Sequence, residues 1–331
     1  MNEKPWSSEH LIRLSGDYWQ ICTLHAAVRL HIFTAIGAGT LSAPEVAERI
    51  GGNRRSVSML LNALSAMRLL EKKGESYSNT EASQRFLSKE SSDYIGYIIL
   101  HHHHLMESWS HLDFAVKSGK PNRTRSFHSS DEQREWFLMG MFNIAMKIAP
   151  LVASEISLAG RRHLLDLGGG PGTYAIHFCL KNPELKATVY DLPATRPFFQ
   201  KTVAQFGLAD RITFQEGDFV RDQIRGGYDV ALLSHILHGE SPENCNKIVK
   251  KAVGTLAAGG MVIIHEFILD NTMDSPLHPA LFSLNMLLGT EEGQSYSERQ
   301  IMDMLANAGA KDIRRLPFKP PGESGIVVAS A

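Results

Sequence analysis

The stretch HLLDLGGGPGTYAIHF, residues 163–178, decides which fold this sequence adopts. It begins with an apolar run that ends around Asp166, continues with four glycines within five residues, and then changes to residues that can start a helix. If the apolar run is a strand, the glycines form the turn at its carboxyl end, where open α/β sheets bind their ligands. The stretch therefore predicts a strand, a ligand-binding turn and a helix, in that order.

The sequence after this stretch extends the same pattern. Short β-rich runs alternate with helical segments, which is typical of a mainly parallel sheet covered by helices on both faces. We expect residues 156–331 to form one α/β domain, with seven strands at HLLDL, ATVYD, ITFQE, YDVALLS, GMVIIHEF, KDIRRL and GIVVAS.

The sequence before it, residues 1–155, is mainly helical in its apolar spacing. In residues 18–36, Ile21, Leu24, Val28 and Ile32 recur at steps of three and four, which predicts a core-facing helix. At 331 residues the chain exceeds the usual span of one core, so a second domain is expected here.

Residues 41–87 resemble a winged helix. A capped helix with Pro44 in its first turn is followed by a Gly-Gly break, a second helix and a polar hairpin around Gly74. Winged helices often bind DNA, and Arg54, Arg55 and Arg68 lie on or near the candidate recognition helix, so a ligand-sensing regulator is one alternative.

Composition argues against several classes of partner. The formal net charge of -1 gives no attraction to nucleic acid or to an anionic membrane surface. Three scattered cysteines without C-x-x-C spacing predict neither a disulfide framework nor a zinc site. The N-terminus lacks the pattern of a secretory leader, and no apolar run reaches the length of a membrane span, so we expect a cytoplasmic protein.

The four histidines at positions 101–104 do not predict a metal site. Successive residues of a helix point in different directions, so the four rings cannot all bind one ion. A partly exposed helix is the better interpretation, and no metal is expected.

The glycine turn limits which ligand can bind there. A phosphate-binding P-loop is excluded because no G-K-[ST] follows. The dinucleotide fingerprint G-x-G-x-x-G needs glycine as its sixth residue. That residue is Thr173 when counted from Gly168 and Ala175 when counted from Gly170, so the fit is imperfect and NAD stays open only in principle. The pattern that fits directly is D-x-G-x-G-x-G, formed by Asp166, Gly168, Gly170 and Gly172.

Acidic residues at three successive strand ends favour a cationic nucleoside. Asp166 ends the first strand, and Asp191, 23 positions after Gly168, is placed to accept both hydroxyls of a ribose. Asp218 follows the third strand, and Phe219 beside it can cover an adenine ring. The combination predicts S-adenosylmethionine, whose amine and sulfonium suit an acid at the strand end.

These motifs resemble those of the small-molecule O-methyltransferases, which include the plant caffeic-acid-type enzymes, acetylserotonin O-methyltransferase and bacterial relatives. The similarity covers nearly the whole chain, through LLDLGGGPG, YDLP, GDF, LLSHILHGESPENC, GGMVIIHEFILD and SYSERQIMDMLANAGA. It implies a Rossmann-like seven-stranded methyltransferase sheet, and an N-terminal winged-helix domain that pairs two subunits into a homodimer rather than reading DNA.

The resemblance also implies the catalytic residues. His238 matches the general base of the family, and Glu266 matches the acid that orients it. A neutral imidazole is the right strength to take a phenolic proton. Ser234, at the end of YDVALLS, is assigned to the cofactor site, and His235 to the lining of the substrate or cofactor pocket.

Two departures from the family pattern bear on the base. Gly239 replaces the aspartate that commonly follows the histidine, and Ser295 stands roughly where plant relatives carry a second glutamate beside it. Glu291 or Glu292 is a candidate substitute. Because some relatives on this scaffold methylate carbon or nitrogen, C- or N-methylation is the first alternative.

The acceptor is expected to be a small apolar or aromatic molecule. Residues 133–158 are helical and apolar, and they are expected either to roof the active site or to fill the core with their methionines. With residues 278–290 they would line an apolar pocket. The candidate lining residues are Phe142, Asn143, Met146, His235, Asn285, Met286 and Thr290.

Overall fold

The computed structural model describes residues 6–125, 127, 130–318, 320 and 322–331. The chain divides into two compact units, Met1–Leu105 and Met106–Ala331. In this division residues 106–155 belong with the second unit, while the sequence-based boundary at residue 155 stays a prediction. The expected absence of a secretory leader concerns the N-terminus, where residues 1–5 lie outside the described part.

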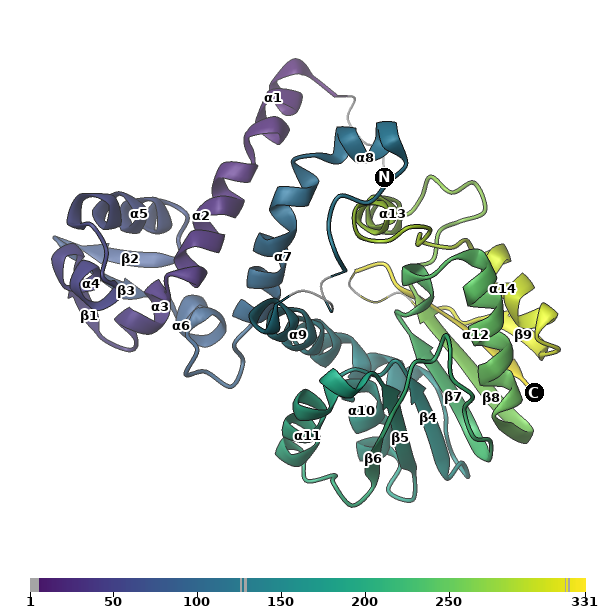
Figure 1. The fold of residues 1–331 in the computed structure, drawn as a ribbon. Coiled ribbons are helices and arrows are strands. Elements are labelled where there is room, and N and C mark those ends of the chain that lie inside the picture. Colours follow the sequence, from purple (N-terminus) through teal and green to yellow (C-terminus); the bar gives the residue numbers. More distant parts are fainter. Residues whose placement is uncertain (1–5, 126, 128–129, 319, 321) are drawn as a thin grey trace. The chain divides into compact units, whose positions relative to one another are not determined.

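The first unit is mainly helical and carries a small antiparallel sheet (Figure 1). Its sheet has the order β1-β3-β2, and a helix pair precedes the β2–β3 hairpin, so the expected winged-helix order is confirmed. The elements, the last of which crosses the division between the units, are α1 (Ser8–Gly16), α2 (Tyr18–Arg29), α3 (Ile32–Ile36), β1 (Thr40–Ser42), α4 (Ala43–Ile50), α5 (Arg54–Ala66), β2 (Leu70–Lys73), β3 (Ser76–Asn79), α6 (Glu81–Leu87) and α7 (Gly96–Trp109).

Local signals in the sequence explain these boundaries. Ser42 and Glu45 form a capping box at the start of α4, next to Pro44. The helix ends at Gly51, whose φ of 65° is the left-handed conformation that glycine adopts without strain. Asn53 then caps α5 by accepting a hydrogen bond from the main-chain N–H of Ser56.

The expectation of one core-facing helix over residues 18–36 is wrong. α2 ends at Arg29, and His31 takes a left-handed conformation with φ of 56°, so the chain turns before α3 begins. Val28 and Ile32 are buried, whereas Ile21 is 45% exposed. The three-and-four spacing therefore spans two helices, and its N-terminal part faces outward.

The second unit contains a seven-stranded sheet of order β6-β5-β4-β7-β8-β10-β9. The five strands from β6 to β8 in this order run parallel, and β10 is antiparallel to both of its neighbours. All seven expected strands are present: β4 (His163–Leu167), β5 (Lys186–Asp191), β6 (Ile212–Glu216), β7 (Tyr228–Ser234), β8 (Leu256–Glu266), β9 (Lys311–Arg315) and β10 (Gly325–Ser330).

Helices cover both faces of this sheet (Figure 1). On β4, Leu164 packs into a core shared with α9 and α10, while Leu165 and Leu167 pack into a core shared with α12 and α14. The elements between and beside the strands are α8 (Leu112–Ser118), α9 (Asp131–Glu155), α10 (Thr173–Lys181), η2 (Pro193–Thr195), α11 (Arg196–Gln205), η3 (Leu237–Gly239), α12 (Pro242–Gly254), α13 (Leu277–Gly289) and α14 (Glu298–Asn307).

Helix α9 is the one described helix whose length and apolar composition would suit a membrane span. Its Ala145, Ile148, Ala149 and Val152 are buried in the core on one face of the sheet. Because this apolar stripe packs against protein, we interpret α9 as a core helix.

The strand order determines where a ligand can bind. The chain runs outward from β4 through β5 to β6, then returns to the other side of β4 for β7 and β8. The switch between these directions leaves a crevice at the carboxyl ends of the parallel strands. Asp166, Asp191, Ser234 and Glu266 all lie at or next to these ends.

Candidate active site

The chain leaves β7 through a strained turn at His235. Its φ of 55° is left-handed, a conformation that histidine adopts more often than most side chains, and its main-chain N–H donates to the carbonyl of His265 at 2.8 Å. The turn leads directly into η3, which carries His238. Strained backbone of this kind concentrates at functional sites.

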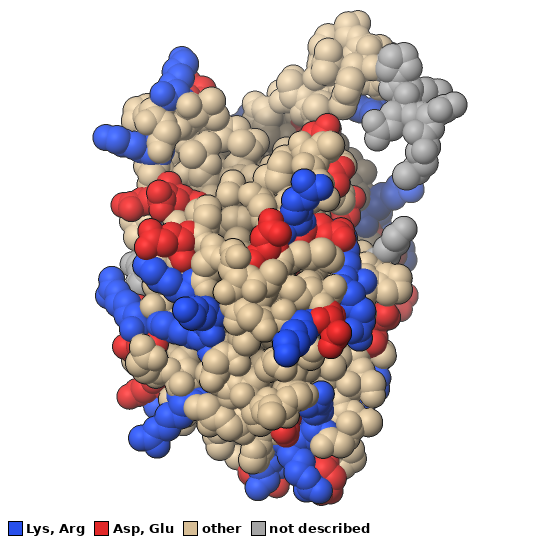
Figure 2. Space-filling view, turned by 90° about the vertical axis from the view of Figure 1, so that its right-hand side faces the viewer, with Lys and Arg blue, Asp and Glu red and all other residues tan. Residues whose placement is uncertain are grey.

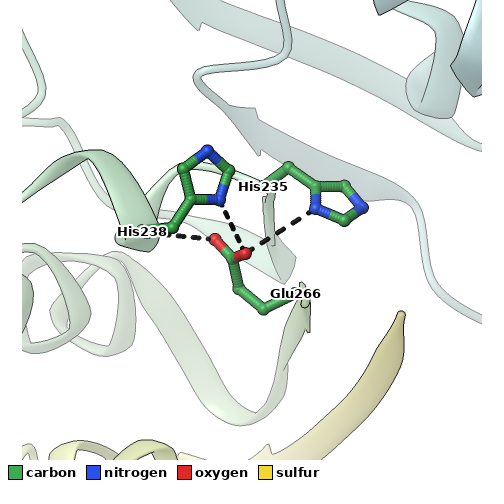
Figure 3. Close-up of side chains that lie close together, drawn as sticks. All are labelled: His235, His238 and Glu266. Atoms are coloured by element: carbon green, nitrogen blue, oxygen red, sulfur yellow. Dashed lines mark hydrogen bonds and ion pairs between the residues drawn. The ribbon is translucent and has the colours of Figure 1, made fainter. Parts of the chain in front are cut away.

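His238 and Glu266 form a close pair (Figure 3). Nδ1 of His238 lies 2.8 Å from Oε2 of Glu266, and Oε1 of the same carboxylate accepts from the main-chain N–H groups of Leu237, at 2.9 Å, and His238, at 3.3 Å. Glu266 therefore fixes both the imidazole ring and the turn that carries it. His235 is more loosely placed, because its Nδ1 is 3.6 Å from Oε2, longer than a hydrogen bond.

Glu266 is ionised in this setting. Burial disfavours its charged form, but the His238 and His235 rings hold the pKa of the carboxyl well below its usual range. Since a carboxylate only accepts hydrogen bonds, Nδ1 of His238 must be the donor. The proton of a neutral His238 ring is thus on Nδ1, which leaves Nε2 with a free electron pair.

Aromatic rings surround the pair. The ring of Phe282 meets that of His238 edge-on at a centroid distance of 4.8 Å, and Phe267 stacks on His238 at 6.2 Å. Phe267 also contacts Phe282 and His278, each at 4.7 Å. These rings give the base an apolar surround suited to an aromatic partner.

The glycine turn is open where a ligand would approach it. Gly168, Gly170 and Gly172 have φ angles of 67°, 55° and 82°, all left-handed. A Cβ added at Gly168 would lie 2.6 Å from Ile236 and 3.2 Å from Phe219, while one at Gly170 would meet nothing within 4 Å. Main chain is therefore bare at Gly170, and Phe219 lies over the start of the turn.

Asp166 is fully buried beneath the turn with one oxygen unsatisfied. Its Oδ2 accepts from the N–H of Ala175 at 3.2 Å, and its Oδ1 has no partner among the described residues. Burial, reinforced by the charge of Asp191, raises the pKa of Asp166 to about 7. An orphaned buried carboxyl of this kind fits a cationic ligand, which would satisfy the oxygen and favour its ionised form.

Asp191 and Asp218 hold neighbouring loops in shape. Asp191 accepts from the N–H groups of Gly170 at 2.8 Å and Leu192 at 2.7 Å, and burial raises its pKa. Asp218 accepts from the N–H of Val220 at 2.9 Å. Each carboxylate oxygen can accept more than one bond, so both residues keep capacity for a ligand hydroxyl.

Ser234 faces the interior of the unit. Its hydroxyl lies 3.0 Å from Nδ1 of His265, whose Nε2 lies 2.9 Å from the hydroxyl of Ser324. Burial lowers the pKa of His265 well below its usual value, so this ring is neutral. The Ser234 side chain is thus part of a buried polar chain behind the site.

The expected substrate-lining residues fall into two groups. Asn285, Met286 and Thr290 are on or next to α13, whose Phe282 contacts His238; Thr290 donates to the carbonyl of Met286 at 2.7 Å and so caps the helix end. Phe142, Asn143 and Met146 are half-buried on α9. In the described part of the chain, the hydrogen bonds and ring contacts of His238 do not reach α9.

The residues expected to supply a second acid do not reach the base. Ser295 is fully buried, whereas Glu291 and Glu292 are exposed and line a cavity of about 290 Å³ together with Gly239. Among the described residues, Glu266 is the acid that pairs with His238.

Three candidate ligand atoms of His235, His238 and Glu266 lie within 4.8 Å of one another, a spacing that a metal ion could use. Glu266 already accepts a hydrogen bond from the Nδ1–H group of His238. This nitrogen would have to lose its proton before it could bind a metal ion. That the site works without a metal stays a prediction.

Sequence reasoning missed the aromatic surround and one cation. Phe267 follows Glu266 directly and was detectable from that position, whereas Phe282 and His278 come from a distant helix with no motif. Arg123, which contacts Asn285, also lies outside every motif.

Comparison with known proteins agrees with this geometry. Residues 109–311 match the model of an O-methyltransferase domain, and residues 12–89 match that of an O-methyltransferase dimerisation domain. The chain is 33% identical to 3-hydroxy-5-methyl-1-naphthoate 3-O-methyltransferase of Streptomyces sahachiroi, over 96% of this chain and 93% of that protein.

Other relatives extend the range of chemistry. The N,N-dimethyltransferase OxyT of Streptomyces rimosus is 28% identical over 90% of this chain and 89% of its own length. The crystal structure of human N-acetylserotonin methyltransferase in complex with S-adenosylmethionine superposes with a TM-score of 0.85 at 25% identity, covering 99% of each chain. The fold, the glycine turn and these matches together place the chain in the O-methyltransferase family of S-adenosylmethionine-dependent enzymes.

Proposed function

We propose that this enzyme methylates a hydroxyl of a small aromatic molecule and that His238 is the general base. The observation that carries the proposal is the 2.8 Å contact between Nδ1 of His238 and the buried carboxylate of Glu266. A ring held in this way presents Nε2, which points away from the carboxylate, to an acceptor (Figure 3).

The pair has the properties that proton removal needs. As the acceptor oxygen attacks, its proton passes to Nε2 of His238, and the imidazolium that forms is stabilised by the negative charge of Glu266. The carboxylate keeps its own hydrogen bonds throughout, because its ionised form is the stable one. Phe267 and Phe282 limit access of water to the ring.

The residues around the glycine turn fit S-adenosylmethionine. Gly170 offers bare main chain, Asp166 an orphaned oxygen, Asp191 and Asp218 acceptor oxygens, and Phe219 an aromatic face. When bound, this cofactor supplies a methyl group activated by a sulfonium. The protein's remaining task is to align the acceptor with that methyl group and to take its proton.

The acceptor class follows from the aromatic surround of His238. A relative named for a hydroxynaphthoate supports an aromatic acceptor with a hydroxyl group. Nitrogen is the competing site of methylation, because another relative is named an N,N-dimethyltransferase.

We also propose that two copies pair through the first unit. Its N-terminal helices expose large apolar side chains, among them Ile12 at 72% and Trp19 at 69%. Exposed apolar surface of this extent marks an interface. The proposal includes a cytoplasmic location and no nucleic-acid or membrane partner. In support, acidic and basic side chains are interspersed on the face shown in Figure 2, rather than forming one basic patch.

Incubation with S-adenosylmethionine labelled with ¹³C in its methyl group tests the function. Paired acceptors should be offered, a hydroxynaphthalene and its aminonaphthalene counterpart. We expect the label to appear as an aryl methyl ether by NMR. A label found only on nitrogen or carbon would contradict the proposal while leaving the cofactor assignment intact.

A further inference from the structure

Arg123 is a largely buried cation whose hydrogen-bond partners are neutral. Its Nη2 donates to the main-chain oxygen and the Oδ1 of Asn285, at 3.2 and 3.1 Å. Its Nε is buried without a partner among the described residues, and burial lowers the pKa of Arg123 to about 10. Buried charges are ordinarily paired, so an orphaned guanidinium group calls for an anionic partner.

Arg125, two residues further along, shows the ordinary arrangement. Its Nη1 donates to Oε1 of Glu240 at 2.7 Å, so its charge is balanced within the protein. In the described part of the chain, no carboxylate lies within ion-pair distance of Arg123. The two arginines share one segment, and the more deeply placed one lacks the counter-charge.

The segment that carries Arg123 is fixed against α13. The main-chain N–H groups of Asn122 and Arg123 both donate to the carbonyl of Leu288, at 3.1 and 3.2 Å. A Cβ added at Gly289 would lie 2.6 Å from Cζ of Arg123, so this glycine makes room for the guanidinium group. The charge is thus held in a built position rather than on a loose surface loop.

Helix α13 also connects this position with the base. Phe282, whose ring contacts His238, and Asn285 and Gly289, which contact Arg123, are spaced by three and four residues and share one helix face. At a rise of 1.5 Å per residue, the His238 and Arg123 contacts are about 5–10 Å apart along the axis. An aromatic molecule can span this interval.

We propose that Arg123 is a carboxylate-binding subsite of the acceptor pocket, and that the acceptor is a hydroxylated aromatic acid with its hydroxyl at His238. The inference rests on the proposed function of the enzyme. A guanidinium group binds a carboxylate through two parallel hydrogen bonds, and its single charge matches a monoanion. Asn285 then positions Arg123.

The test compares acids with their uncharged counterparts. The full-length enzyme is offered 3-hydroxybenzoate, 4-hydroxyphenylacetate and 3-hydroxy-2-naphthoate, each beside its primary amide. Both kcat/KM with S-adenosylmethionine and Kd by calorimetry in the presence of S-adenosylhomocysteine are measured. We expect at least one acid to be preferred over its amide by tenfold or more.

Substitutions then locate the preference. Arg123→Met should reduce the ratio of kcat/KM for the acid to kcat/KM for its amide by roughly 10- to 100-fold, the range for a charge-assisted pair. The change should arise mainly from KM and be matched by Kd. Arg123→Lys should restore part of the ratio. Gly289→Ala keeps the charge but displaces the guanidinium group, so it should also lower the ratio, and Arg125→Met is the matched control whose ratio should match the parent's.

The outcomes are separable from those of the proposed function. Equal losses for acid and amide in Arg123→Met would make Arg123 merely structural and overturn the subsite. Equal binding of acids and amides by the parent, or no binding of either, would overturn it as well. Tight binding of an acid through Arg123 without any methyl ether product would instead contradict the O-methylation proposal and leave the subsite standing.

Discussion

Glu266 holds His238 by its ring and by its main chain at once. Oε2 lies 2.8 Å from Nδ1 of the ring, and Oε1 accepts from the N–H of the same residue at 3.3 Å. The carboxylate therefore determines both where the imidazole is and which nitrogen carries the proton. The predictions that concern catalysis follow from this double contact.

Glu266→Gln should impair turnover without unfolding the protein. The amide oxygen can still accept main-chain bonds, but the amide NH₂ can donate to Nδ1 and favour the tautomer with its proton on Nε2. We expect kcat to fall by roughly 10²–10⁴, as for other misoriented catalytic histidines. Steady-state kinetics beside a thermal melt checks this, and a variant with parent-like kcat would show that Glu266 does not orient the base.

Asp166→Asn should change stability in a pH-dependent way. In the folded, cofactor-free protein the pKa of Asp166 is raised to about 7, so its unfolded carboxyl ionises at lower pH. The stability contributed by the protonated form is present below the unfolded pKa and is lost as pH rises to about 7.

Asparagine cannot ionise and avoids that loss. The gain in Tm of Asp166→Asn over the parent should therefore be larger at pH 8 than at pH 4.5, as measured by scanning calorimetry without cofactor. Asp191, whose pKa is also raised by burial, is present in both proteins. The same Tm difference at both pH values would refute the assignment of a buried, neutral Asp166.

Asp191→Ala should weaken the binding of the cofactor and also loosen the glycine turn. It removes the proposed ribose acceptor and also the bond from Gly170 N–H at 2.8 Å. We expect S-adenosylmethionine affinity to fall by roughly 2–4 kcal/mol by calorimetric titration. Asp191→Asn, which keeps one acceptor oxygen, should lose less, and undiminished affinity in the alanine variant would count against the ribose contact.

The fold was largely predictable because its signals are local. The seven strands of the second unit follow from apolar runs bounded by turn residues, and α4 from its proline and capping serine. The break at His31 was not predictable, because a left-handed histidine has no sequence signature and tertiary packing overrides the helical spacing.

The site was predictable only where a motif carried it. Family resemblance brought His238 and Glu266 together, whereas Phe282 reaches the base from a helix that is distant in sequence, and His278 of the same helix contacts Phe267 beside it. The significance of Arg123 depends on its having no carboxylate within ion-pair distance among the described residues, which the sequence alone does not reveal. Such contacts are products of packing rather than of residue pattern.

Dimerisation should depend on the exposed apolar helices of the first unit. Replacing Trp19 and Ile12 by lysine puts charges into the proposed interface, so sedimentation velocity should show the double variant as a monomer at micromolar concentration. Leu180→Lys, at a residue 49% exposed on α10, is the matched control and should stay dimeric. A monomeric parent protein would rule the pairing out.

The most direct test of the account is the turnover of His238→Ala. Without the ring, the acceptor proton has no recipient, while the glycine turn that binds the cofactor is untouched. We expect kcat to fall by roughly 10²–10⁴ with S-adenosylhomocysteine affinity retained. A variant that keeps most of its turnover and the parent's pH profile would contradict the base assignment and favour methylation of carbon or nitrogen.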